Sequence, residues 1–175
     1  MAKDPLFAVA YRLELLKNAC VTLPARKERN NPGARRARIA IIDDHPLVRE
    51  RLTEIFNRES DLLVCGEAED RHTAIVVIKE TAPDLVIVDL TLKDSDGLEL
   101  IKDLRARWPR LNILVVSMHD ESLFAERVIR AGAKGYITKQ EATKNILVAV
   151  RRVLEGGVYL NEKAAGTLIK RLSGL

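Results

Sequence analysis

The sequence predicts an α/β fold in which helices cover both faces of an open, five-stranded parallel sheet. Short apolar runs rich in β-branched residues alternate five times with longer stretches of helical period between residues 38 and 157. The runs IAII, LVIV and ILVV are apolar at consecutive positions, which is typical of parallel strands covered on both faces. Together these two patterns indicate five strand–helix units of one doubly wound sheet.

The units follow one another at regular spacing. The predicted strands cover residues 39–42, 62–65, 85–88, 113–116 and 135–138, and the predicted helices cover residues 47–56, 73–79, 98–108, 123–129 and 146–154. The helices carry apolar stripes; in the third, Leu98, Ile101 and Leu104 recur at helical spacing before Pro109. Because parallel connections are almost always right-handed, few topologies remain for such a chain.

The composition is that of a folded chain. Of the 175 residues, 47% are hydrophobic and 31% are charged, with 29 basic and 25 acidic side chains. This apolar fraction is enough to bury a core, which excludes a disordered polyelectrolyte. The sequence contains no uncharged apolar run of about 18 residues and no secretory signal pattern. We therefore expect a cytoplasmic protein that makes no membrane contact.

The positive charge is concentrated at the start of the chain. Residues 1–38 carry nine Lys and Arg against three Asp and Glu, whereas the rest of the chain carries 20 against 22. Segment 24–38, rich in Pro, Asn and Arg, is interpreted as a basic linker, and apolar spacing before it predicts a short helix. Residues 1–37 are thus expected to form an extension with a solvated spacer. Weak, salt-sensitive contact of this tail with nucleic acid is the alternative.

Polar side chains follow four of the five predicted strands. Asp43 and Asp44 follow the first strand, Asp89 the third, Ser117 the fourth and Lys139 the fifth. Each residue type alone is common in helix caps and turns. Because the carboxyl ends of parallel strands meet at the edge where α/β sheets bind ligands, we expect the five side chains to converge.

This set of side chains suits phosphoryl chemistry with a metal ion. Converging carboxylates repel one another unless a cation lies among them, and Mg²⁺ prefers such oxygen ligands. A cation beside Asp89 would neutralise an incoming phosphoryl group and let this carboxylate attack phosphorus, forming an acyl phosphate. Lys139 would add a second positive charge, and Ser117 a hydroxyl donor. His45 is interpreted as a helix-start residue because imidazole favours softer metals.

Four motifs occur in order within residues 38–157: IAIIDDHPLVRERL, PDLVIVDLTLKDSDGLELI, ILVVSMHDE and AGAKGYITK. In order and spacing they resemble the receiver domain of bacterial two-component response regulators, and DDHP and GYITK resemble the NarL/FixJ subfamily. The resemblance implies a flavodoxin-like (CheY-like) sheet of strand order 2-1-3-4-5. It also implies a phosphorylation-dependent signalling switch rather than an enzyme in the ordinary sense.

The resemblance implies that Asp89 is the phosphoacceptor and that a sensor histidine kinase is the partner that phosphorylates it. The domain would catalyse its own phosphorylation and dephosphorylation. The implied Mg²⁺ ligands are the carboxylates of Asp43, Asp44 and Asp89 and the backbone carbonyl of Thr91.

The resemblance further implies how the switch would work. Ser117 and Lys139 match positions that bind the phosphoryl group, and Tyr136 matches the aromatic switch position. Thr91 and His119 match positions that modulate the lifetime of the phosphoryl group. Phosphorylation would draw Ser117 inward, and Tyr136 would then occupy the space it vacates.

Residues 158–175 are predicted to form a linker helix capped by Asn161. The apolar positions on one face of this helix are Ala165, Leu168, Ile169 and Leu172. In NarL/FixJ regulators a similar helix leads into a helix-turn-helix DNA-binding domain, which this sequence lacks. The resemblance therefore implies a receiver without its output domain, and a natural stand-alone receiver is the alternative. It allows a homodimer, with DNA binding only through a missing C-terminal domain or weakly through the basic tail.

Two alternatives from other classes remain. A haloacid-dehalogenase-type phosphatase also combines an Asp nucleophile with Mg²⁺, Ser and Lys, but it carries a DxD motif after its first strand, where this sequence has adjacent Asp43 and Asp44. A phosphorylation-independent pseudo-receiver is the second alternative, and the presence of all five site residues argues against it. Multiple turnover of a phosphomonoester would favour the first, and failure to bind Mg²⁺ the second.

Overall fold

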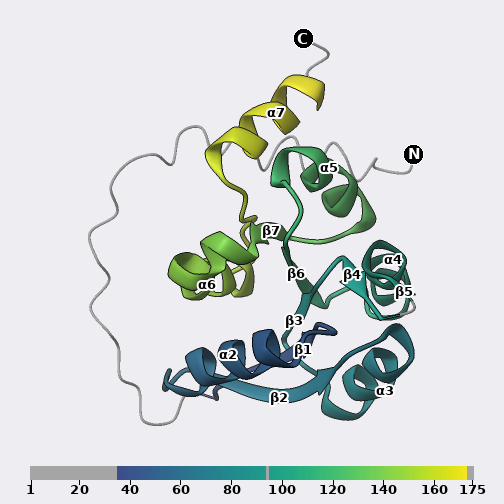
Figure 1. The fold of residues 1–175 in the computed structure, drawn as a ribbon, viewed down its shortest axis with the longest axis vertical. Helices are drawn as coiled ribbons and strands as arrows, with labels where there is room; N and C mark the ends of the chain where they lie inside the picture. The colour runs from purple at the N-terminus through teal and green to yellow at the C-terminus, as the bar shows by residue number, and fades with distance from the viewer. Residues whose placement is uncertain (1–34, 94, 173–175) are drawn as a thin grey trace.

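The computed structural model describes residues 35–93 and 95–172. Five parallel strands form the central sheet, in the order β2-β1-β3-β6-β7. They are β1 (Ala37–Ile42), β2 (Leu62–Ala68), β3 (Leu85–Val88), β6 (Asn112–Ser117) and β7 (Gly135–Thr138). The predicted 2-1-3-4-5 order of the five main strands is confirmed (Figure 1). The short helix expected before residue 24 lies outside the described residues.

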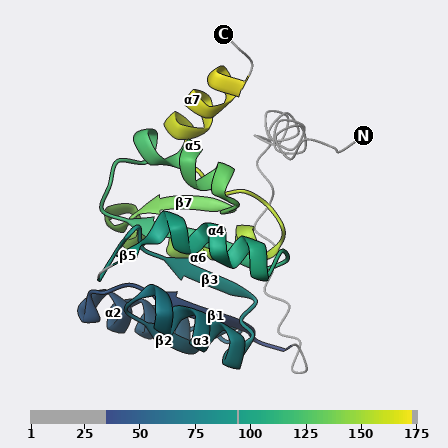
Figure 2. The ribbon, with the colours of Figure 1, turned by 90° about the vertical axis from the view of Figure 1, so that its right-hand side faces the viewer.

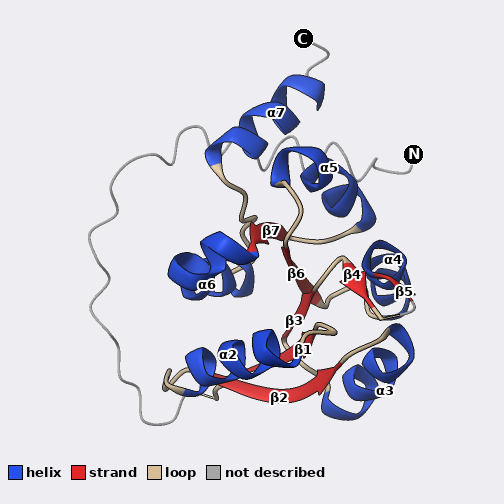
Figure 3. Cartoon of the chain, in the orientation of Figure 1, coloured by secondary structure: helices blue, strands red, loops and turns tan. Residues whose placement is uncertain are grey.

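Helices cover both faces of the sheet (Figure 3). On one face lie α2 (Pro46–Asn57) and α6 (Lys139–Leu154). On the other lie α3 (Arg71–Thr81), α4 (Gly97–Arg107) and α5 (Glu121–Ala131). A sixth described helix, α7 (Glu162–Leu172), packs against α5 beyond the edge of the sheet (Figure 2). None of the helices in the described ranges is long and apolar enough to cross a membrane.

The consecutive apolar residues of the strands supply two separate cores. In β3, Leu85 and Ile87 belong to the core beneath α2 and α6, whereas Val86 and Val88 belong to the core beneath α3, α4 and α5. All four are at most 1% exposed. Side chains alternate between the faces of a strand, so a strand covered on both faces must be apolar at every position.

The structure contains a small hairpin that the sequence pattern did not predict. Strands β4 (Thr91–Leu92) and β5 (Ser95–Asp96) pair antiparallel between β3 and α4. Two-residue strands are too short to show an alternating pattern, so they leave no periodic signal. The hairpin matters for the site because it positions the backbone that follows β3.

The fifth helix of the sheet region starts earlier than its apolar stripe suggested. The stripe predicted a helix from residue 146, whereas α6 begins at Lys139. The Thr138 side chain caps it by accepting a hydrogen bond from the Glu141 N–H at 3.2 Å. The first two turns are mostly polar, so apolar periodicity missed them. Lys139 therefore stands in the first turn of a helix rather than in a loop.

The chain after α6 returns to the sheet before entering α7. The Tyr136 N–H donates to the Tyr159 carbonyl at 2.9 Å, and the Tyr159 N–H donates to the Lys134 carbonyl at 3.0 Å. Asn161 caps α7 as expected, accepting a hydrogen bond from the Ala164 N–H at 2.8 Å. The predicted apolar face requires one correction: Ala164 and Leu168 are buried, whereas Ala165 is only partly buried. The buried face of α7, which packs against α5, therefore includes Ala164 as well as the predicted Leu168.

Glu121 gives the fold a pH-dependent stability. The side chain is 2% exposed, and burial, followed by repulsion from Glu141 and Asp120, raises its pKa to about 7 in spite of a hydrogen bond from the Asn161 N–H. The folded state thus binds a proton that the unfolded chain releases near its ordinary value of 4.5. This contribution is present below pH 4.5 and is lost as the pH rises through 7.

We expect the contribution of Glu121 to the free energy of unfolding to fall by roughly 2 kcal/mol between pH 5 and 8. This is somewhat less than the whole pKa shift corresponds to, because solvent screens part of the interaction. Urea unfolding of the wild type and of Glu121→Gln at both pH values measures this difference, since the amide does not titrate. Identical pH dependence of the two proteins would contradict the prediction.

Candidate functional site

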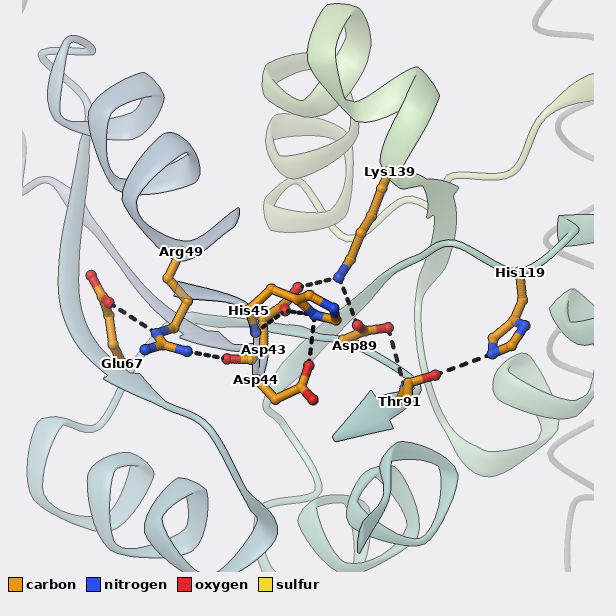
Figure 4. A network of polar contacts seen from close by, with 9 residues as sticks. All are labelled: Asp43, Asp44, His45, Arg49, Glu67, Asp89, Thr91, His119 and Lys139. Atoms are coloured by element: carbon orange, nitrogen blue, oxygen red, sulfur yellow. Dashed lines mark hydrogen bonds and ion pairs between the residues drawn. The ribbon is translucent and has the colours of Figure 1, made fainter. Parts of the chain in front are cut away.

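Three of the predicted site residues are in direct contact at the carboxyl edge of the sheet (Figure 4). Asp43 follows β1, Asp89 follows β3, and Lys139 follows β7. The Lys139 Nζ lies 2.7 Å from Asp43 Oδ2 and 2.7 Å from Asp89 Oδ2. Asp43 and Asp89 are each 2% exposed, and the Lys139 side chain is 9% exposed. The strand ends therefore bring these groups together as the sequence predicted.

The two carboxylates keep Lys139 charged. Burial on its own lowers the pKa of the ammonium group and is the largest single effect. The hydrogen bonds that Lys139 donates to Asp43 and Asp89, together with the charges of these carboxylates, outweigh it, so the pKa of Lys139 is raised above 10.5. A buried lysine with a raised pKa is a fixed positive charge at the edge of the sheet.

Asp44 and His45 complete an acidic cluster beside this contact. The four ligand atoms contributed by Asp43, Asp44, His45 and Asp89 all lie within 4.8 Å of one another. The Asp44 Oδ1 atom is buried and has no hydrogen-bond partner in the described residues. His45 Nδ1 lies 2.6 Å from this oxygen, but the pair lacks hydrogen-bond geometry. A buried carboxylate oxygen without a partner favours a cation beside it.

The donor set fits Mg²⁺. It offers three carboxylates, which are hard oxygen ligands, in a group of atoms small enough to surround one ion. His45 lies at the N-cap of α2, as its interpretation as a helix-start residue predicted. Its exposed ring nevertheless contacts the acidic cluster, with Nδ1 3.1 Å from Asp43 Oδ1. Sequence reasoning did not anticipate this placement of the ring.

Thr91 and His119 form a bridge beside Asp89. The Thr91 N–H donates to Asp89 Oδ1 at 3.3 Å, and Thr91 Oγ1 lies 3.2 Å from His119 Nε2. The His119 ring stacks on Phe124, with ring centroids 4.8 Å apart. Two residues that are 28 positions apart in sequence thus meet at the site. The structure gives these residues a shared hydrogen bond that the sequence could not reveal.

Ser117 and Tyr136 are both fully buried, and they lie next to each other. The Ser117 hydroxyl accepts a hydrogen bond from the His119 N–H at 3.4 Å, and the Tyr136 hydroxyl donates to the His119 carbonyl at 2.9 Å. Burial raises the pKa of Tyr136 to about 12, although its hydrogen bond with Ser117 lowers it somewhat. In the described residues, the hydrogen bonds of Ser117 are directed toward Tyr136 and His119 rather than toward Asp89.

Two residues that position the site were missed by sequence reasoning. The Arg49 guanidinium donates to the Asp43 backbone carbonyl at 2.5 Å and lies 3.4 Å from Glu67 (Figure 4). At Gly97, the first residue of α4, a Cβ would overlap the backbone carbonyl oxygen of Asp89. The DG pair in the second motif, Asp96–Gly97, was a signal for such a close approach.

We expect Gly97→Ala to displace the Asp89 backbone. The added methyl group has no room, since the built Cβ would also lie 2.7 Å from Leu90 Cα. Overpacking of this kind lowers the free energy of unfolding by about 2 kcal/mol, and urea unfolding measures it. Gly166→Ala is the matched control, because a Cβ there meets nothing within 4 Å. An equal effect of the two substitutions would contradict the prediction.

A parallel sheet that gathers an acidic pair, a lone carboxylate and a lysine at its carboxyl edge defines a phosphoryl-accepting receiver. Sequence comparison agrees, because the family model of the response regulator receiver domain matches residues 39–151. The chain therefore belongs to the response regulator receiver domain family, which confirms the resemblance. As a receiver it is a signalling domain rather than an enzyme in the ordinary sense.

The individual relatives are NarL/LuxR-type regulators. The transcriptional regulatory protein DegU of Brevibacillus brevis is 34% identical over 132 residues, which span 75% of this chain and 56% of that protein. A LuxR-family response regulator from Aurantimonas sp. SI85-9A1 superposes with a TM-score of 0.72 at 34% identity, covering 78% of this chain and 97% of that chain. The receiver domain of NarL from Mycobacterium tuberculosis gives 0.65 at 29% identity, covering 70% and 98%. The chain thus spans little more than half of DegU.

Proposed function

We propose that Asp89 is the phosphoacceptor and that the chain works as the switch of a two-component system. A sensor histidine kinase would supply the phosphoryl group. The observation that carries this proposal is the shared contact of Lys139 with Asp43 and Asp89, beside a buried Asp44 oxygen that accepts no hydrogen bond in the described residues. This arrangement places the Asp89 carboxylate next to the positive charge of Lys139 and next to a candidate cation site.

Asp89 would act as the nucleophile. One of its carboxylate oxygens attacks phosphorus in line, a phosphorus–oxygen bond forms, and the phosphorus–nitrogen bond of the phosphohistidine breaks, so that the neutral imidazole leaves. The Lys139 ammonium group would neutralise a phosphoryl oxygen, and the Ser117 hydroxyl would donate a hydrogen bond to another once it turns toward Asp89. Bound Mg²⁺ would supply the charge that offsets repulsion between the phosphoryl oxygens and the carboxylates.

The proposed Mg²⁺ ligands are the carboxylates of Asp43, Asp44 and Asp89 and the Thr91 backbone carbonyl. The hydrogen bond that the Thr91 N–H donates to Asp89 Oδ1 supports the assignment of the Thr91 carbonyl, because it holds the Thr91 backbone beside the acidic cluster. Arg49 would keep the Asp43 end of the cluster in place through its bond to the Asp43 carbonyl.

Incubation with Mg²⁺ and acetyl phosphate tests the proposal. We expect one acid-stable, base-labile phosphoryl group per chain, measured by intact mass, and none when a chelator removes Mg²⁺. Borohydride reduction converts an acyl phosphate of aspartate to homoserine, so peptide analysis locates the group at residue 89. Absence of the phosphoryl group, or its location elsewhere, would overturn the proposal.

The Thr91–His119 bridge would control how long the phosphoryl group survives. Because it lies beside Asp89, it restricts the approach of a water molecule to the acyl phosphate. We expect Thr91→Ala and His119→Ala each to shorten the phosphoryl half-life severalfold, measured after removal of excess donor. Thr81→Ala, at the end of α3 and at the opposite edge of the sheet, serves as the control. Half-lives equal to that of the wild type would contradict the prediction.

The output of the switch would be transcriptional. DegU is a transcriptional regulatory protein, of which this chain spans 56%. The family resemblance supports DNA binding through a C-terminal output domain. A homodimer and a cytoplasmic location fit the same proposal, whereas residues 1–37 would contribute at most weak, non-specific contact with DNA. Sedimentation with and without acetyl phosphate measures whether the chain dimerises when phosphorylated.

A further inference from the structure

Glu121 connects the loop after Ser117 to the start of α7. It is the first residue of α5 and is 2% exposed. Its Oε1 accepts a hydrogen bond from the Asn161 N–H at 2.8 Å, and its Oε2 accepts one from Asn161 Nδ2 at 2.6 Å. Both carboxylate oxygens thus bind a single residue that is 40 positions away. Buried carboxylates are costly without such partners, so this contact holds the two segments together.

Asn161 uses its side chain in two directions. Its amide nitrogen donates to Glu121, while its amide oxygen accepts a hydrogen bond from the Ala164 N–H. The same amide therefore caps α7 and is oriented by Glu121. We refer to the Glu121–Asn161 contact as the clamp.

The clamp lies next to the proposed switch residues. Only residues 118–120 separate Ser117 from Glu121, and this loop is held by the Tyr136 hydroxyl on the His119 carbonyl. The backbone of Tyr136 also binds the Tyr159 carbonyl, just before the cap of α7. The start of α7 is thus connected to the loop after Ser117 through Glu121 and to Tyr136 through Tyr159, and the helix packs against α5 (Figure 2).

We infer that the clamp couples the phosphoryl site to α7: phosphorylation of the site releases the clamp and loosens the helix. The inference rests on the proposed function. Its direction follows from the sheet order, in which β6 lies between β3 and β7. Asp89 follows β3, whereas Asn161 lies beyond β7, so a Ser117 that is drawn toward Asp89 pulls the loop away from Asn161.

The clamp offers a substitution that separates it from the cap. Asn161→Asp keeps an oxygen that caps α7, because aspartate and asparagine are equally good caps. It replaces the amide donor that faces Glu121 with an acceptor, so the hydrogen bond to Glu121 Oε2 is lost, and above pH 7, where Glu121 is ionised, the two carboxylates repel. In the double variant Glu121→Gln/Asn161→Asp, the glutamine amide at position 121 can donate to the carboxylate at position 161, which restores the contact with donor and acceptor exchanged.

Hydrogen–deuterium exchange of the full chain tests the coupling, with intact mass recording the phosphoryl group on the same samples. After treatment with Mg²⁺ and acetyl phosphate, we expect the α7 amides of the wild type to exchange roughly fivefold faster. Asn161→Asp should exchange fast before treatment and change little after it. The double variant should regain both the slow exchange and the response. Ala165→Gly, which weakens the helix without touching the clamp, should exchange faster in both states and keep the response.

Two results would overturn the inference while leaving the proposed function in place. One is a phosphorylated wild type whose α7 exchange does not change. The other is Asn161→Asp with the full response of the wild type. Failure of the wild type to gain a phosphoryl group is a different outcome, since it would overturn the proposed function and the inference with it.

Discussion

Asp89→Asn is expected to abolish phosphorylation by acetyl phosphate. The amide cannot act as the nucleophile, and it removes one of the carboxylates that would bind Mg²⁺. We expect the phosphoryl group to be absent by intact mass at times when the wild type is fully modified. The fold should persist, because Lys139 keeps its contact with Asp43 at 2.7 Å.

Asp96→Asn is the matched control for this experiment. Asp96 is an exposed carboxylate close to the site in sequence, and its side chain caps α4 by accepting a hydrogen bond from the Leu98 N–H at 2.8 Å. Asparagine caps a helix as well as aspartate does, so this change removes a charge without changing the fold. Full phosphorylation of Asp89→Asn, or equal loss in both variants, would refute the role of Asp89.

Lys139→Met is expected to destabilise the protein strongly when no divalent ion is present. The substitution keeps most of the side-chain volume but leaves Asp43 and Asp89, each 2% exposed, without their shared cation. Removing one member of a buried ion pair typically costs about 3 kcal/mol or more. We expect urea unfolding to show this loss, and millimolar Mg²⁺ to recover part of it by supplying charge to the same carboxylates.

Lys144→Met, an exposed position on the same helix, should change the free energy of unfolding by less than about 0.5 kcal/mol. The comparison separates loss of the site cation from loss of a lysine on α6. If Lys139→Met were as stable as Lys144→Met, the Lys139 contacts with Asp43 and Asp89 would contribute nothing to the fold, and the argument for a charge-balanced site would fail.

Glu121 connects the loop after Ser117 to α7, the last helix of the described residues. Neither its burial nor its partner is visible in the sequence, since a glutamate at a helix start is ordinarily an exposed residue that interacts with the helix dipole. The contact exists because residues 158–160 run beside β7 and carry Asn161 to the start of α5. The inferred coupling between the site and α7 therefore depends on the way residues 158–160 run back beside β7.

The sequence pattern by itself determined the sheet and which residues stand at the strand ends, and the resemblance to receiver domains implied the order of the strands. Strands covered on both faces must be apolar at every position, and parallel strands must end at one edge, so Asp43, Asp89 and Lys139 had to converge. Only the tertiary structure decided the hairpin after Asp89, the Thr91–His119 bridge and the contact of Glu121 with Asn161. The hairpin strands are too short to show a pattern, and the other two features depend on contacts between segments far apart in the chain, which leave no periodic signal in the residues that make them.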